Sequence, residues 1–227
     1  MRKISIGQLL SFLVLATVAA LAAYAALRFT WRLLEGWPEL RGLVSTLVAV
    51  LMFYGWLIAL HRAMLAVAPL REGDISEESS QEFVYHVYLL FYLIFFFPVM
   101  SSFILPVPAM RLFYQLLGAR FGTNSFPGGV ILDPRFVTVG DNTLLGRDSI
   151  LIPHAIEGRH LAHFPIRIGS NVTIGARAIL MAGVEVGDGA VIAVNSVVGK
   201  GQNIPAGEIW GGTPARKLGA NEHLGRR

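Results

Sequence analysis

Aliphatic residues recur every six positions through the C-terminal part of the chain. Small or β-branched residues stand two positions before most of them, and glycine often follows. The aliphatic positions are Val139, Leu145, Leu151, and then Ile168, Ile174, Leu180, Val186, Ile192, Val198 and Ile204. Because alternate side chains of a strand point to the same face, each hexapeptide supplies one short strand with inward side chains, followed by a turn. So short a period predicts a β-solenoid in which three hexapeptides close one triangular coil.

The N-terminal part of the chain contains long uncharged runs instead of a repeat. The first run covers residues 4–27, the second residues 42–60, and the third residues 83–110, which include His86 and several prolines. About 20 apolar residues suffice to cross a bilayer, so the pattern predicts two or three transmembrane helices. The third run either crosses or lies partly in the interface. A cleaved signal peptide fits poorly, since its apolar stretch usually has about 7–15 residues.

Composition sharpens this division into a membrane part and a soluble part. The chain is 54% hydrophobic and 15% charged, whereas soluble domains carry about 25% charged residues. It contains no cysteine, which excludes disulfides and thiolate metal sites. The net charge of +4 comes without a basic run interleaved with aromatics, which argues against a nucleic-acid partner. Arginines in the first connection between helices favour a cytoplasmic C-terminal domain by the positive-inside rule.

The fold class expected from these patterns is α + β. The repeat is broken between Leu151 and Ile168, whose separation is not a multiple of six, so residues 153–165 are expected to form an inserted loop. The expected parts are a transmembrane helical domain over 1–107, an amphipathic juxtamembrane helix over 108–126, a β-helix over 127–205 and a capping segment over 206–227. Insertions on one face of a repeat scaffold commonly build the functional site.

The repeat resembles that of the hexapeptide-repeat acyltransferases. The resemblance is carried by IRIGSNVTIGARAILMAGVEVGDGAVIAVNSVV and by the closing phrase IPAGEIWGGTPARKL, and it covers roughly residues 118–217. It implies a left-handed parallel β-helix, a homotrimer and an active site between neighbouring solenoids. It also implies acetyl-CoA or another acyl-CoA as donor substrate, with an acyl carrier protein left open as an alternative donor.

Half of the chain's histidines lie in or beside the insertion. An imidazole with a pKa near 6.5 can take a proton from an attacking hydroxyl or amine. The resemblance implies one such base at the end of a coil, just before the inserted loop, where His154 stands; His163 is the second candidate. Glu157 could orient an imidazole, and His160 is expected to be an exposed loop residue. Zinc catalysis is the alternative, but the ligand spacing of β-helical carbonic anhydrases is missing, so no metal is expected.

Candidate donor-binding residues follow from the resemblance, which places a pantetheine arm against small residues at turns. These are Ala176, Val194, Asn195 and Gly199, with Lys200 and Arg216 available for the phosphates. The chain departs from the family pattern because Ala193 and Asn195 replace glycines and Gly201 replaces an acidic residue. Bulkier residues at these turns would narrow the groove for the pantetheine arm, so the sequence does not determine the length of the acyl group.

The resulting hypothesis is an acyltransferase, most simply an acetyltransferase, integral to a bacterial-type inner membrane. Its acceptor would be a hydroxyl or amine of a membrane lipid or lipid-linked glycan, because a hydrophilic acceptor would not require anchoring. The apolar N-terminal region and the phrase LLGARFG also resemble the membrane and solenoid tail of large peptide-assembling synthetases, which suggests an amide-forming enzyme as the alternative. A non-catalytic trimeric membrane scaffold is a third interpretation.

Overall fold

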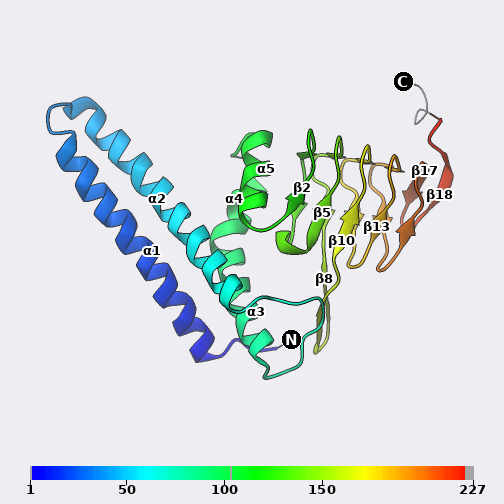
Figure 1. The fold of residues 1–227 in the computed structure, drawn as a ribbon, viewed down its shortest axis with the longest axis horizontal. Helices are drawn as coiled ribbons and strands as arrows, with labels where there is room; N and C mark the ends of the chain where they lie inside the picture. Colours follow the sequence, from blue (N-terminus) through cyan, green and yellow to red (C-terminus); the bar gives the residue numbers. More distant parts are fainter. Residues whose placement is uncertain (1, 103, 223–227) are drawn as a thin grey trace. The chain divides into compact units, whose positions relative to one another are not determined.

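The computed structural model describes residues 2–102 and 104–222, which Figure 1 shows coloured along the sequence. The described chain separates into two compact units. One is helical and consists of Arg2–Leu70 and Glu77–Phe97. The other begins with the short segment Arg71–Ser76, resumes at Pro98 and contains the repeat.

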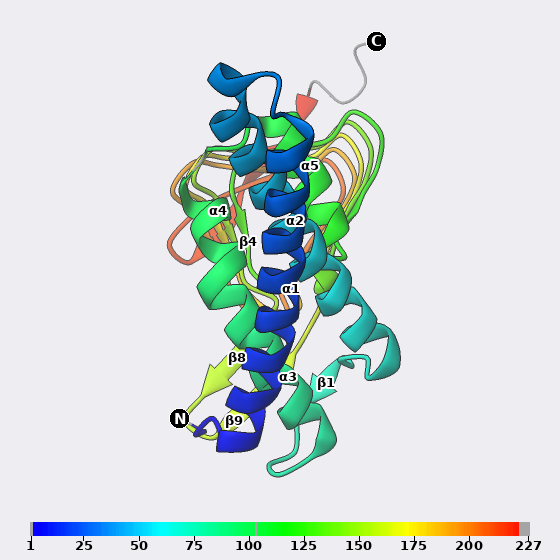
Figure 2. The same cartoon turned by 90° about the vertical axis from the view of Figure 1, so that its left-hand side faces the viewer.

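The helical unit is built from the uncharged runs. Its elements are α1 (Ile6–Leu33), α2 (Pro38–Val67), α3 (Ser80–Phe91) and the π-helical turn η1 (Tyr92–Phe96). The chain then continues as α4 (Phe97–Ser102), most of which belongs to the other unit. Helices α1 and α2 run alongside each other in both views (Figures 1 and 2). Among the described residues, three helices are long and apolar enough to cross a membrane: Ile6–Leu33, Pro38–Val67 and Ser80–Ser102.

Polar side chains of the helical unit pair with one another. Ser5 and Gln8 form a capping box that satisfies free N–H groups at the start of α1. The Gln8 amide oxygen also lies 3.1 Å from Nδ1 of His86 on α3. Arg2 and Glu82 form an ion pair at 3.1 Å. The contacts of Gln8 and Arg2 tie the first helix to the third, because each joins the N-terminal segment to α3.

The amphipathic segment after the apolar runs folds as α5 (Val107–Leu116), which is shorter than the expected range of 108–126. The helix ends because Gly118 adopts φ +111, a left-handed conformation that glycine tolerates best. The strand β2 (Arg120–Phe121) follows and pairs in parallel with Thr138 and Val139. Solenoid pairing therefore begins inside the range expected to be helical, because the first coil starts before the six-residue aliphatic series becomes visible.

The repeat folds into stacked coils whose strands form three parallel sheets in the described part of the chain. The first sheet holds β2, β5 (Val137–Val139), β10 (Ile166–Ile168), β13 (Glu185–Val186) and β16 (Asn203–Ile204). The second holds β3 (Phe126–Pro127), β6 (Leu144–Leu145), β11 (Thr173–Ile174), β14 (Val191–Ile192), β17 (Glu208–Gly212) and the antiparallel β18 (Ala215–Ala220). The third holds β4 (Val130–Ile131), β7 (Ile150–Leu151), β12 (Ile179–Leu180) and β15 (Val197–Val198).

The register of these sheets confirms the parallel β-solenoid predicted from the repeat. Leu180 lies opposite Leu151 on one side and Val198 on the other, and all three are fully buried. Ile174 pairs in the same way with Leu145 and Ile192. The aliphatic positions therefore form columns inside the coil, and burial of these columns against each other stabilises the stack.

The insertion expected as a loop is a β-hairpin. Its strands are β8 (His154–Glu157) and β9 (His160–His163), which pair antiparallel with His154 opposite His163. The short strand β1 (Gly73–Asp74), from the segment Arg71–Ser76, adds to the outer edge of β9. The hairpin is ordered because its backbone groups are paired on both edges of β9.

Candidate active site

The central feature of the site is a contact between His154 and Asp133 at one corner of the solenoid. His154 follows β7, and Asp133 follows β4 on the preceding coil. Because Ile131 of β4 lies opposite Leu151 of β7, the residues that follow these strands are brought next to each other. Nδ1 of His154 lies 2.5 Å from Oδ2 of Asp133, although the two residues are 21 apart in the chain.

The two partners differ in exposure. The Asp133 side chain is 4% exposed, whereas that of His154 is 22% exposed. Asp133 adopts φ +47 and precedes the short 3-10 helix η2 (Pro134–Phe136), whose Phe136 N–H binds the Asp133 carbonyl oxygen. This turn directs the carboxylate inward to the imidazole. A carboxylate at Nδ1 favours the tautomer with hydrogen on Nδ1, which leaves Nε2 with a lone pair for accepting a proton.

His163, the second candidate base, lies behind this pair and is 0% exposed. Its ring stacks on Phe136 with centroids 4.3 Å apart and an interplanar angle of 15°. Burial lowers the pKa of His163 to about 4; the negative charge of Asp133 raises this pKa, and His154 lowers it further. His163 is therefore neutral near pH 7 and shielded from solvent, so its place suits packing under the site better than contact with a substrate.

The remaining polar residues of the hairpin face other partners. Nε2 of the exposed His160 lies 2.9 Å from Oδ1 of Asp74 on β1. Glu157 accepts a hydrogen bond from the Lys200 ammonium group, which lowers the pKa of the Glu157 carboxyl. The structure thus places Glu157 against Lys200 and gives Asp133 the place beside His154. Sequence reasoning missed Asp133, although an Asp-Pro pair directly after a coil strand was a signal for a special turn.

The candidate donor-binding residues fall into separate groups within one chain. Ala176, Val194 and Asn195 line a hollow of about 430 Å³ at the corners after the second sheet, together with Arg147, Asp148 and Arg177. Gly199 and Lys200 follow β15, at the corner after the third sheet. Arg216 lies on β18, where its guanidinium donates to the carbonyl oxygen of Ala215.

Asn195 occupies a turn position with φ +55, and Arg177 has φ +59 at the corresponding position one coil earlier. Non-glycine residues are uncommon at such angles, and asparagine is among those that tolerate them best. The side chains at these turns extend into the hollow where glycines would leave it open. Within residues 2–102 and 104–222, no three histidine, aspartate or glutamate side chains converge as a metal site would require.

Comparison with known proteins finds similar sequences for the repeat. Residues 165–200 match the family model described as the hexapeptide repeat of succinyl-transferase. The chain is also 35% identical to galactoside O-acetyltransferase of Escherichia coli, over 39% of this chain and 46% of that protein. The solenoid is thus similar to the hexapeptide repeats of named acetyltransferases. The chain spans only about half the length of the first curated relatives that it matches.

Two further similarities are to a synthetase and to an acetyltransferase of known structure. Delta-poly-L-ornithine synthetase of Acinetobacter baumannii is 28% identical over 52% of this chain, which corresponds to 9% of that large protein. A hexapeptide-repeat acetyltransferase of Vibrio cholerae, solved in complex with acetyl coenzyme A, is 32% identical over 46% of this chain and 61% of that chain, with a TM-score of 0.42.

Proposed function

We propose that this protein is a membrane-anchored acetyltransferase that moves an acyl group from acetyl-CoA to a membrane-associated acceptor. The acceptor would offer a hydroxyl or amine of a lipid or lipid-linked glycan. The observation that carries the proposal is the pairing of His154 with buried Asp133 at the solenoid corner. It stands in a domain whose relatives include named acetyltransferases.

In the proposed reaction, Nε2 of His154 removes the proton from the acceptor as its oxygen or nitrogen attacks the thioester carbonyl. The new C–O or C–N bond forms, the C–S bond breaks, and the thiolate of coenzyme A leaves and takes the proton from the imidazolium. Asp133 stabilises the positive charge on His154 while the proton is held there, as the buried acid does in other His–Asp pairs. Backbone N–H groups beside the groove would stabilise the oxyanion.

The division of the donor-binding candidates supports a homotrimer with sites between subunits. Ala176 and Val194 lie at one corner of the coil and Lys200 at the next. A single extended donor would meet both groups most directly in a groove that two copies form together. Arg216 and Lys200 would then supply positive charge to the phosphates of coenzyme A. The acyl carrier protein stays the alternative carrier of the thioester.

The helical unit supports a location in the inner membrane. Its three long apolar helices have the length and composition of spans. An odd number of crossings would place the two ends of the chain on opposite sides, with the solenoid in the cytoplasm by the positive-inside rule. We therefore propose that the helices hold the solenoid close to an acceptor that cannot leave the bilayer.

An amine acceptor is the second candidate, favoured by the similarity to delta-poly-L-ornithine synthetase. The two chemistries are separable with radiolabelled acetyl-CoA, purified protein and a membrane lipid extract. Label that mild alkali releases indicates an ester, and label that survives indicates an amide. A His154→Ala variant should lose both products. Full cellular function of that variant would instead support the third interpretation, a membrane scaffold without catalysis.

A further inference from the structure

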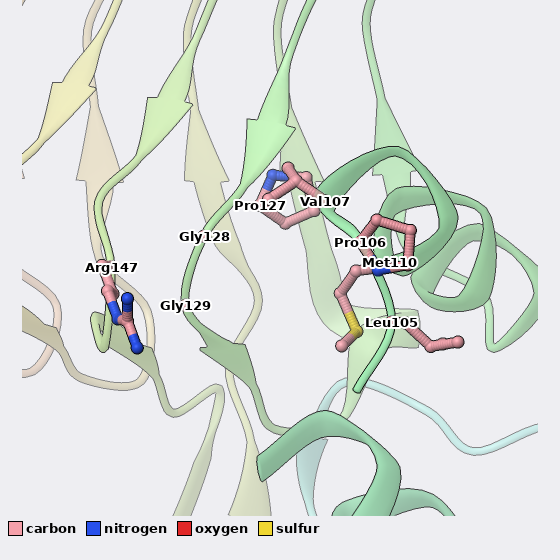
Figure 3. Close-up of a pocket in the computed structure, with 8 residues that line it drawn as sticks. All are labelled: Leu105, Pro106, Val107, Met110, Pro127, Gly128, Gly129 and Arg147. Carbon is pink, nitrogen blue, oxygen red and sulfur yellow. The ribbon is translucent and has the colours of Figure 1, made fainter. Parts of the chain in front are cut away.

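A second hollow, of about 370 Å³, lies at the start of α5 and is mainly apolar. Its walls are Leu105, Pro106, Val107 and Met110 on one side, the solenoid turn Pro127–Gly129 on the other, and Arg147 at its edge. Figure 3 shows Leu105 and Met110 on the far side of this turn from Arg147. The volume is at the lower end of the range typical of ligand pockets. An apolar cavity with one cation at its edge is complementary to a hydrocarbon chain with an anionic head group.

The position of this hollow along the chain points to the membrane as the source of its ligand. Leu105 follows Ser102, the last residue of the third apolar helix, by three residues. The chain between them can span at most about 11 Å. A helix that crosses the bilayer would therefore end close to the hollow, where the hydrocarbon chain of a lipid is within reach.

The hollow and the His154–Asp133 pair lie at opposite ends of the same two strands. Gly129 precedes β4 and Asp133 follows it, while Arg147 precedes β7 and His154 follows it. These strands pair directly, with Val130 opposite Ile150. Gly129 and Asp133 are thus at most roughly 14 Å apart along the chain.

Helix α5 holds this arrangement in place. The buried Tyr114 hydroxyl donates to the carbonyl oxygen of Gly129 at 3.0 Å and accepts from the N–H of Ile131 at 3.2 Å. Met110, one turn earlier on the same helix, forms part of the wall of the hollow. The apolar wall and the strand that leads to Asp133 are therefore fixed by one element.

From this geometry we propose that the hollow binds a hydrocarbon chain of the membrane acceptor and that Arg147 binds its anionic head group. This proposal rests on the proposed acyl transfer to a membrane acceptor. It adds the acceptor's chemical class, a lipid with a phosphate or carboxylate next to its chain. Bound in this way, the head group would lie at the end of the β4–β7 strand pair opposite the His154–Asp133 pair.

The test is photolabelling of the full chain in phosphatidylcholine nanodiscs. The probe is lysophosphatidic acid with a diazirine in its acyl chain, and labelled residues are found by mass spectrometry. We expect label on the peptide that contains Leu105–Met110. Val107→Trp fills the hollow and should reduce this label about tenfold or more. Leu112→Trp is the matched control, since Leu112 is exposed on the same helix outside the hollow, and should leave the label unchanged.

The charge is tested with Arg147→Gln, which should weaken labelling by the phosphate probe and spare labelling by a neutral monoacylglycerol probe. Arg120→Gln, at an exposed arginine of β2 that lines neither hollow, should change neither. Labelling that is confined to the long helices, or that Val107→Trp leaves unchanged, would overturn the proposal. Stronger competition with the probe by palmitoyl-CoA than by unlabelled lysophosphatidic acid would also overturn the proposal, because it would show that the hollow binds the acyl chain of the donor.

The outcome is separable from that of the proposed function. Labelling does not require acyl transfer. Label in the hollow of a protein that shows no His154-dependent transfer would therefore support the lipid site and contradict the proposed enzymatic activity. His154-dependent transfer to the lipid extract without label in the hollow would support the proposed activity and contradict the lipid site.

Discussion

Nδ1 of His154 lies 2.5 Å from Oδ2 of Asp133, and the aspartate is almost completely buried while the histidine reaches solvent. Such a pair has one buried acceptor that orients the ring and one exposed nitrogen that can exchange a proton. The chemistry proposed for the protein depends on this contact.

Replacing His154 tests the base directly. His154→Gln should reduce turnover by at least about 10²-fold, the scale for loss of a general base, with little change in the KM for acetyl-CoA. His160→Gln is the matched control, because this histidine is exposed and pairs with Asp74 on the outer edge of the hairpin. Steady-state rates of thiol release from acetyl-CoA would show the difference. Equal rates for the two variants would show that His154 is not the general base.

Replacing Asp133 tests how the ring is oriented. Asp133→Asn keeps the shape of the side chain but removes the charge that stabilises the protonated ring. We expect kcat to fall about tenfold or more while the KM for acetyl-CoA stays the same. Glu157→Gln should leave kcat near its original value, because Glu157 pairs with Lys200. A larger loss from Glu157→Gln than from Asp133→Asn would reverse the assignment of the two carboxylates.

Tyr114 is predicted to stabilise the junction between α5 and the first coil. Tyr114→Phe leaves the Gly129 carbonyl and the Ile131 N–H without this partner, and a buried unpaired group costs about 1–3 kcal/mol. The midpoint of thermal unfolding in detergent should fall by several degrees, since about 1 kcal/mol corresponds to about 2–4 °C at this size. Tyr24→Phe changes an exposed tyrosine of α1 and should have no such effect. An unchanged midpoint for Tyr114→Phe would show that water replaces the lost contact.

Burial of His163 predicts that the fold loses stability in acid. Its pKa is lowered to about 4 in the folded protein, against about 6.5 when unfolded, so the unfolded chain binds more protons between these values. The contribution is fully present above pH 6.5 and is lost as the pH falls toward 4, by an amount on the order of 3 kcal/mol.

Denaturation curves at pH 7 and pH 5 would measure this loss. His163→Phe keeps an aromatic ring against Phe136 and removes the titrating group, so it should flatten the pH dependence. His160→Gln should keep it. A pH dependence that survives in His163→Phe would assign the acid sensitivity to another group.

The hollow at Val194 is predicted to accept the donor. Val194→Trp should raise the KM for acetyl-CoA about tenfold or more, because the indole would occupy the space beside Ala176 and Asn195. Val194 is 63% exposed, so the fold should tolerate the change. Leu218→Trp, at an exposed position outside the hollow, is the control for the effect of a surface tryptophan. An unchanged KM would place the donor on another part of the solenoid.

The sequence by itself determined the solenoid and the long apolar helices. A six-residue period places Leu180 and Val198 eighteen residues apart and permits one register in which both are buried, so the columns after the insertion follow from the pattern alone. The apolar helices could be predicted equally well from the sequence, because an uncharged run of sufficient length is a local property. The break in the period also located the insertion and drew attention to His154.

Only the tertiary structure decided which groups meet at the site. Asp133 reaches His154 because successive coils stack, which brings together residues 21 apart, and no local pattern encodes that contact. The pairing of Gly73 and Asp74 with the hairpin is equally non-local, since it joins residues about 90 apart. Glu157 was near His154 in sequence, but the hairpin directs it to Lys200. Periodicity sets the direction of each side chain, whereas coil stacking and strand pairing determine its neighbour.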